Sequence, residues 1–236
     1  MPHHAERPDA KPLSTSLSPG GILVDNAAAL IATLVGATIL TATVIADRLN
    51  VLDVRISNRL AAAGTDQLDT VFRALTELGG GPIVLPLAGI CAAVAWRRSP
   101  PLGAAILLAV AARYGMEGLL KDGIGRDHPT ADRVIEATGY SFPSGHVFGA
   151  TVGWGLVPAA VRAVTDQSAP WRAAVGTWAV IVALVATSRV YLGVHWFTDT
   201  LGSVLFGLLV LALLDVAGRS KAPQPVAAGH TADEGD

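Results

Sequence analysis

The chain has 236 residues, of which 51% are hydrophobic and only 15% are charged, and its mean hydropathy is +0.48. Soluble domains usually carry about 25% charged residues, so this composition argues against a soluble protein and indicates an integral membrane protein. No basic run suggests a nucleic-acid partner, so we expect none; the formal net charge of -2 carries no information on this point.

Polar segments stand at both ends of the chain. Residues 1–20 are polar and proline-rich, and they lack the charged-then-apolar pattern of a cleaved signal peptide. Residues 218–236 are also polar and contain prolines. Segments of this composition cannot bury enough apolar surface to fold. We therefore expect two disordered tails around one membrane domain at residues 21–217.

Six apolar stretches are candidates for membrane-spanning helices. A bilayer core about 30 Å thick needs roughly 20 mostly apolar residues per helix. Five stretches reach or approach this length: residues 27–46, 102–120, 147–165, 172–190 and 197–217. The sixth, residues 81–96, is shorter and contains Pro82 and Pro86. The predicted fold is all-α, a bundle of six transmembrane helices whose many small residues allow close packing.

The segment between the first two spans, residues 47–80, has a different pattern. Apolar residues recur at helical spacing between charged ones; the apolar set is Leu68, Val71, Phe72, Leu75 and Leu78, and the charged set is Asp66, Asp69, Arg73 and Glu77. This pattern predicts an amphipathic helix that lies in the membrane interface or covers the bundle. Such a helix is either a plain connector or an element that helps to admit a lipid.

Three polar clusters adjoin the ends of predicted spans. The first, Lys121 to Pro129, follows the third span, and the second, Tyr140 to Gly149, opens the fourth. The third cluster, Ser188 to Asp199, joins the fifth span to the sixth. Because consecutive spans cross the bilayer in opposite directions, all three clusters are predicted to meet at one membrane face.

The charge distribution predicts the orientation of the chain. Basic residues on the side of the tails are Arg7, Lys11, Arg97, Arg98, Arg162, Arg172, Arg219 and Lys221. The side of the clusters has Arg48, Arg55, Arg59 and Arg73 in addition to the cluster residues. Lys and Arg accumulate on the cytoplasmic side of membrane proteins. We therefore expect cytoplasmic tails and a site on the outer face of a plasma membrane, and the alanine-rich sequence suggests a bacterial one.

His195 and Asp199 form a candidate nucleophile pair in the third cluster. They are four residues apart, so on a helix they share one face. A carboxylate bonded to one imidazole nitrogen fixes the tautomer and leaves the other nitrogen nucleophilic. Arg189, in the same cluster, offers a planar fork of donors that suits phosphate oxygens.

The second cluster combines Ser144, Gly145 and His146. Ser144 is placed to cap a helix that begins near Gly145, and the glycine lets the backbone approach a ligand closely. A helix N-terminus offers unpaired N–H groups to an anion. His146 can then donate a proton to a leaving oxygen. The alternative is an ordinary serine cap beside an incidental histidine.

The first cluster supplies positive charge through Lys121, Arg126 and His128. Arg113, Glu117 and Lys121 lie at four-residue steps, a spacing that allows them to pair along the third span. The clusters contain neither a carboxylate set for Mg²⁺ nor a Cys/His set for zinc. Together they predict phosphoryl transfer through a phosphohistidine, without metal or other cofactor, with the cationic groups stabilising the transition state.

These clusters resemble the signature of the type 2 phosphatidic acid phosphatase superfamily, in its integral-membrane branch, which is related to the vanadium haloperoxidases. The family pattern is K-x6-R-P, then P-S-G-H, then S-R-x5-H-x3-D. The second motif matches at residues 143–146, and the third matches at Ser188, Arg189, His195 and Asp199. In the first motif Lys121 and Pro129 match, but His128 replaces the arginine. The likeness covers about residues 22–217.

The resemblance implies a role for each matching residue. It implies His195 as the nucleophile, Asp199 as its orienting partner and His146 as the general acid. It also implies phosphate binding by Lys121, Ser144, Gly145 and Arg189, with Arg126 and His128 sharing the work of the missing arginine. We expect phosphate affinity to rise as His128 becomes protonated, and vanadate to compete with substrate.

The predicted function is hydrolysis of a lipid phosphate or pyrophosphate at the bilayer surface. We expect undecaprenyl pyrophosphate as the substrate, with phosphatidic acid and phosphatidylglycerol phosphate as the close alternatives. Lipid A dephosphorylation and phosphate transfer between lipids stay open. An alternative of another class is a catalytically weak membrane protein that binds a lipid phosphate, which only His128 favours. The sequence specifies no oligomeric state.

Overall fold

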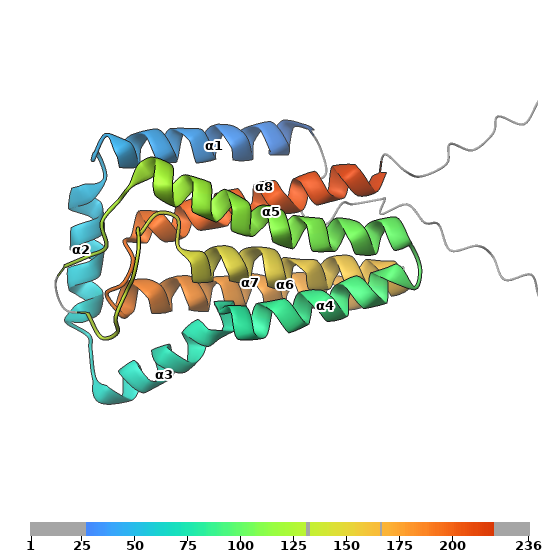
Figure 1. Cartoon of the computed structure of the whole chain (residues 1–236). Helices are drawn as coiled ribbons and strands as arrows, with labels where there is room; N and C mark the ends of the chain where they lie inside the picture. The colour runs from blue at the N-terminus through green and yellow to red at the C-terminus, as the bar shows by residue number, and fades with distance from the viewer. Residues whose placement is uncertain (1–26, 131–132, 166, 220–236) are drawn as a thin grey trace, which may run out of the picture.

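The apolar stretches of the sequence fold into long helices that lie alongside one another in the computed structural model (Figure 1). The structure describes residues 27–130, 133–165 and 167–219. In these ranges the α-helices are α1 (Ala27–Ile45), α2 (Asn50–Ala61), α3 (Asp66–Thr76), α4 (Gly81–Trp96), α5 (Pro100–Ile124), α6 (Gly145–Val164), α7 (Ser168–Tyr191) and α8 (Phe197–Arg219). A short 3₁₀-helix, η1 (Glu77–Gly79), joins α3 to α4. The two predicted tails lie outside the described residues, except that residues 218 and 219 end α8.

The predicted spans coincide with helices of the structure. Among the described residues, five helical stretches are long and apolar enough to cross a bilayer, one of them running from α3 through α4 (Asp66–Trp96). A sixth is added if α1 and α2, which meet at 88°, count as one broken span. Residues 81–96, the shortest predicted span, form α4 despite their prolines. Pro82 lies in the first turn, where a missing N–H costs nothing, and Pro86 lies within the helix. The prediction of an all-α transmembrane bundle is confirmed.

The amphipathic segment between the first two spans forms two helices instead of one. α2 crosses the end of the bundle, and α3 runs obliquely into α4 (Figure 1). The Tyr191 hydroxyl fixes α3 to the end of α7, because it donates to Asp69 Oδ1 at 2.8 Å and accepts from the N–H of Thr65 at 3.2 Å. Leu68 and Val71 stay exposed on α3, as expected for a helix with one face toward lipid.

α6 is the central helix, and it contacts α4, α5, α7 and α8. Small residues make this possible, because a methyl group at Gly153 would lie 2.6 Å from Val84 Cγ1 of α4. A methyl group at Gly155 would lie 2.5 Å from Leu211 Cδ1 of α8. Close approach of backbones at small residues is the usual basis of helix packing in lipid. The N-terminus of α6 is therefore held at the middle of the bundle end.

The three polar clusters meet at one end of the bundle, as predicted. The end of α5, the start of α6, the end of α7 and the start of α8 lie at the end that α2 crosses (Figure 1). Glycines make the two sharp turns that this requires. Gly125 ends α5 with φ 64°, and Gly193 follows α7 with φ 71°. Both values belong to the left-handed region that favours glycine.

Candidate active site

A polar cavity of about 430 Å³ lies where the three clusters meet. Six of the nine predicted site residues line it: Lys121, His128, Gly145, His146, Arg189 and His195. Ser144 and Asp199 are fully buried next to this wall, and the Ser203 hydroxyl contacts the carbonyl oxygens of both, at 3.0 and 2.7 Å. The structure therefore brings together residues from three loops that are far apart in the sequence.

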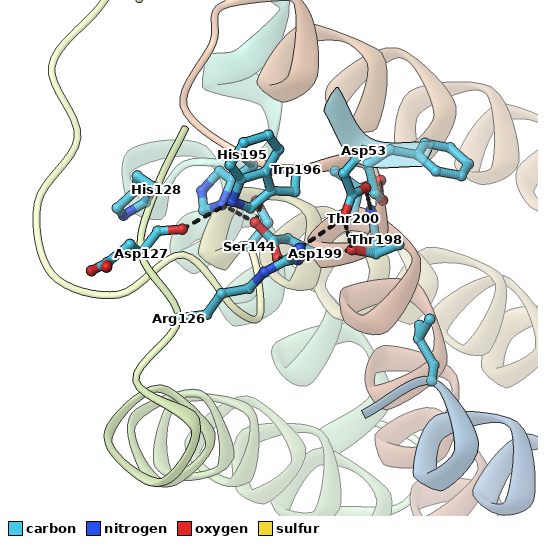
Figure 2. Close-up of polar contacts among 12 residues, drawn as sticks. Asp53, Arg126, Asp127, His128, Ser144, His195, Trp196, Thr198, Asp199 and Thr200 are labelled. Carbon is cyan, nitrogen blue, oxygen red and sulfur yellow. Dashed lines mark hydrogen bonds and ion pairs between the residues drawn. The ribbon is translucent and has the colours of Figure 1, made fainter. Parts of the chain in front are cut away.

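The imidazole of His195 faces the carboxylate of Asp199, with Nδ1 3.5 Å from Oδ2 (Figure 2). The four-residue spacing suggested that His195 and Asp199 lie on the same helix. In the structure His195 lies in the loop before α8, and Asp199 lies in the first turn of α8. The N–H of Trp196 donates to Asp199 Oδ2 at 2.9 Å, which is the backward half of a helix capping box. The start of α8 thus holds the carboxylate in front of the histidine, although His195 Nδ1 makes no hydrogen bond within the described residues. Contacts in free enzymes are often long in this way and shorten when substrate binds.

Burial keeps His195 in its neutral form. The loop between α7 and α8 carries it outside both spans, and only 3% of its surface is exposed. Burial lowers the pKa of His195 from 6.5 to about 4, Asp199 acts in the opposite direction, and the charge of Arg189 lowers the pKa further. A neutral imidazole whose Nδ1 faces a carboxylate has a free lone pair on Nε2, which is the state required of a nucleophile.

α6 begins at Gly145, as predicted, directly beside the cavity. Ser144 takes the N-cap position, and its carbonyl accepts the N–H of Phe148 at 2.9 Å. Its side chain, however, makes no capping hydrogen bond. The Ser144 hydroxyl is buried and has no partner within the described residues. A buried hydroxyl is costly to leave unpaired, so this one is suited to a ligand atom.

A ladder of charges on α5 supports the start of α6. Glu117 accepts from Arg113 at 2.8 Å and from Lys121 at 3.3 Å, so the pairing suggested by their spacing is confirmed. Arg113 also donates to the carbonyl of Gly145. A methyl group at Gly145 would lie 2.3 Å from Glu117 Oε1, so only glycine fits between the two helices without a shift.

Two further side chains bring free nitrogen atoms to the cavity. His128 interacts through Nδ1 with the carbonyl of Val194, while its Nε2 is buried and unpartnered as far as the chain is described. Arg189 donates from Nη1 to Thr76 Oγ1 at 3.1 Å, and its Nε is buried without a partner among the same residues. Both nitrogen atoms are therefore available to a ligand while the existing contacts stay in place.

Comparison with known proteins identifies the family. The profile of the PAP2 superfamily matches residues 102–218. Phosphatidylglycerophosphatase B of Bacillus subtilis is 30% identical over 178 residues, which is 75% of this chain and 88% of that protein. The chain belongs to the PAP2 superfamily.

Two solved structures have the same arrangement of helices. A transmembrane PAP2-type phosphatidylglycerolphosphate phosphatase of Bacillus subtilis superposes with a TM-score of 0.71 at 28% identity, over 78% of this chain and 93% of the other. LpxE of Aquifex aeolicus superposes with a TM-score of 0.51 at 19% identity, over 69% and 94%, and this likeness concerns the fold alone. The chain is therefore a membrane lipid phosphatase of the PAP2 type, and the cavity is its candidate active site.

Arg126, a predicted phosphate ligand, does not line the PAP2 cavity. Its guanidinium is engaged by two carboxylates, Asp199 at 2.5 Å and Asp53 at 2.7 Å (Figure 2). Sequence reasoning missed Asp53, which lies on α2 and is fully buried. The only signal was a carboxylate between the apolar residues Leu52 and Val54, in a helix that looks interfacial.

The PAP2 site also depends on Gly79, which sequence reasoning missed as well. Its backbone lies so close to α6 that a methyl group there would be 2.2 Å from the carbonyl oxygen of His146. A methyl group at Gly149 would in turn lie 2.5 Å from the carbonyl oxygen of Gly79. η1 therefore packs closely against the first turn of α6 and fixes the position of His146 in the cavity wall. The run of three glycines at 79–81 was the available signal.

Proposed function

We propose that this PAP2 protein hydrolyses the terminal phosphate monoester of phosphatidylglycerol phosphate, without a metal, through a phosphohistidine on His195. One observation carries the proposal: buried polar atoms that lack protein partners in the described part of the chain lie in or directly beside a cavity lined by His195 and His146. These atoms are Ser144 Oγ, His128 Nε2 and Arg189 Nε. With Lys121 and the N-terminus of α6, they can surround the three outer oxygens of a phosphoryl group.

In the first step, Nε2 of His195 attacks phosphorus and the bond from phosphorus to the lipid oxygen breaks. His146 gives its proton to that oxygen, so the lipid leaves as an alcohol. Asp199 stabilises the positive imidazolium while it forms. Arg189, Lys121 and the N–H groups of the first turn of α6 stabilise negative charge on the equatorial oxygens.

In the second step, water attacks the phosphorus of the phosphohistidine and the nitrogen–phosphorus bond breaks. His146, now neutral, accepts the proton from the water. Inorganic phosphate leaves, and His195 and His146 return to their starting states. The cycle consumes one water and requires no other reactant.

The choice of phosphatidylglycerol phosphate rests on the 30% identical relative, which is named a phosphatidylglycerophosphatase. Undecaprenyl pyrophosphate, the substrate expected from the sequence, differs in its leaving group. A glycerol alkoxide needs a proton to leave, whereas a lipid phosphate is already a stable anion. Loss of the general acid His146 should therefore slow hydrolysis of phosphatidylglycerol phosphate far more than hydrolysis of a diphosphate.

The orientation proposed for the enzyme places the cavity on the outer face of the membrane and both tails in the cytoplasm. It rests on the excess of basic residues on the tail side, which includes Arg97 and Arg98 between α4 and α5, Arg162 in the last turn of α6 and Arg172 near the start of α7. Substrate would then be dephosphorylated in the outer leaflet, and phosphate released outside.

The test is phosphate release by the detergent-purified protein with EDTA present. The panel contains phosphatidylglycerol phosphate, phosphatidic acid, undecaprenyl pyrophosphate and a soluble phosphomonoester, each with wild type, His195→Ala and His146→Gln. We expect the highest kcat/KM for phosphatidylglycerol phosphate and no release by His195→Ala. We also expect an acid-labile phosphohistidine when His146→Gln is rapidly quenched during turnover of undecaprenyl pyrophosphate, whose leaving group needs no proton while the second step still lacks its base. A preference for undecaprenyl pyrophosphate would overturn the substrate, and no release from any lipid between about pH 5 and 8, the range in which histidine titrates, would overturn the enzyme proposal.

A further inference from the structure

Asp53 is the buried residue of α2, whose other residues are exposed or half-buried. None of its surface is exposed, whereas its neighbours Val51, Leu52 and Val54 are 73%, 42% and 39% exposed. An ionised carboxylate is costly to remove from water unless charge and hydrogen bonds compensate it. Its position is therefore explained only by what it contacts on the inner side of α2.

Both oxygens of Asp53 contact residues of the active-site end. Oδ1 accepts the N–H of Thr198 at 2.9 Å, and Oδ2 accepts the Thr198 hydroxyl at 2.6 Å. Oδ2 also accepts Nη2 of Arg126 at 2.7 Å. Asp53 thus joins α2 to the first turn of α8, one residue before Asp199.

Arg126 continues the chain of contacts to Asp199. Its Nη1 donates to Asp199 Oδ1 at 2.5 Å and to the Thr198 hydroxyl at 2.8 Å (Figure 2). The guanidinium also lies beside the indole ring of Trp196, 5.6 Å from its centroid. Asp199 therefore uses one oxygen for Arg126 and the other for Trp196 N–H and His195. This division fixes the rotation of the carboxylate about its own axis.

The charges in this group decide how strongly Asp199 can act on His195. Asp53 and Arg126 together are neutral, so the full negative charge of Asp199 stays available to the imidazole. Without the charge on Asp53, the guanidinium would be balanced by Asp199 alone. Asp199 would then be drawn toward Arg126 and become a weaker acceptor for the His195 proton.

We propose that Asp53 and Arg126 are positioning residues of the phosphatase reaction, which hold Asp199 with Oδ2 against His195. The inference rests on the proposed nucleophile His195. It gives Arg126 a role behind the nucleophile in place of phosphate binding, and it makes the interfacial helix α2 part of the active site. The chain of contacts runs from Asp53 through Arg126 and Asp199 to His195.

The experiment is a double-mutant cycle on phosphate release with Asp53→Asn, Asp199→Asn and the double variant. We expect Asp53→Asn to lower kcat about 10- to 100-fold, as is common for partners that orient a catalytic group, with KM changed by less than about 2-fold. Asp199→Asn should lower kcat by roughly 10³- to 10⁴-fold, and the double variant should be no slower than Asp199→Asn. Full additivity of the two effects would overturn the proposal, because Asp53 would then not act through Asp199.

Asp215→Asn is the matched control. Asp215 is equally buried on α8, 1% exposed, but it lies 16 residues beyond Asp199, about 24 Å along the helix. A loss of kcat in both Asp53→Asn and Asp215→Asn would indicate a general cost of removing a buried carboxylate. If Asp53→Asn does not fold, Thr198→Val can replace it, because it removes the hydroxyl shared by Asp53 and Arg126 with little change of shape. We then expect a smaller decrease in kcat, again with KM nearly unchanged.

A spectroscopic readout separates this inference from the proposed function. In protein with ¹⁵N-labelled histidine, the ring signals of His195, assigned with His195→Gln, should shift in Asp53→Asn and stay unchanged in Asp215→Asn. If wild type releases no phosphate from any lipid, the proposed function fails, and the spectra still test the contact chain. If wild type is active while Asp53→Asn matches it in kcat and in these signals, the proposed function stands and the positioning role is wrong.

Discussion

His128 and His195 lie side by side in the cavity wall, with ring centroids 5.0 Å apart and ring planes inclined by 58°. His128 stands where the PAP2 signature has an arginine, so His195, the proposed nucleophile, has an imidazole neighbour instead of a permanent cation. Because its Nδ1 faces the carbonyl of Val194, that nitrogen carries the proton of the neutral ring. The buried Nε2 then presents a lone pair to the cavity, and it becomes a donor only on protonation.

Phosphate affinity should therefore rise in His128→Arg, because a guanidinium is a permanent donor at a position where the imidazole presents a lone pair. We expect the inhibition constant of inorganic phosphate to fall by about 10-fold, the effect of one added charge-assisted hydrogen bond. The measurement is that inhibition constant for wild type and His128→Arg at a single pH. An unchanged constant would contradict the role of His128 in phosphate binding.

Protonation of buried His195 should destabilise the fold in acid. Its pKa is about 4 in the folded protein against 6.5 ordinarily, so between these values the unfolded chain binds more protons. Above about pH 6.5 the histidine is neutral in both states and does not reduce the free energy of unfolding. As pH falls from 6.5 toward 4, this free energy decreases. Thermal unfolding in detergent between these limits should show a smaller pH dependence for His195→Gln than for wild type. An equal slope for both would mean that other groups control acid unfolding.

Gly79→Ala should impair catalysis although Gly79 does not itself line the cavity. The new methyl group would meet the His146 carbonyl and displace the first turn of α6 or η1. Overpacking of this kind costs about 1–3 kcal/mol of stability, and a shift of a catalytic group by about 1 Å costs on the order of 10²-fold in rate. Thermal unfolding and phosphate release would be compared with Gly89→Ala, in the same bundle, where a methyl group has no atom within 4 Å among those described. Equal activity of the two variants would show that His146 tolerates the contact.

The orientation can be tested with single introduced cysteines. Cys91, the one native cysteine, is buried in α4 and 3% exposed, so it should give little background. Ala63→Cys lies at the cavity end and Gln167→Cys at the opposite end, and both positions are exposed. A membrane-impermeant maleimide should label Ala63→Cys on intact cells and Gln167→Cys only after permeabilisation. The reverse pattern would place the active site in the cytoplasm.

The positions of the spans and the meeting of the three clusters follow from the sequence alone. Both depend on local quantities, because the length of an apolar run decides whether a helix can cross the bilayer, and alternation decides which ends share a face. The spacing of His195 and Asp199 likewise placed an imidazole next to a carboxylate, although the first lies in a loop and the second on α8. The four-residue steps on α5 predicted the pairing of Glu117 with its neighbours for the same reason.

Only the tertiary structure decided which polar residues turn inward and which atoms stay free. Asp53 and Arg126 are 73 residues apart, and their contact exists because α2 crosses the end of the bundle. The approach of Gly79 to His146 depends on how η1 packs against α6. The Ser144 hydroxyl is free because its side chain does not cap α6, which the N-cap preference of serine could not reveal. Such contacts join distant segments, so they are fixed by packing of the whole bundle and leave no periodic pattern in the sequence.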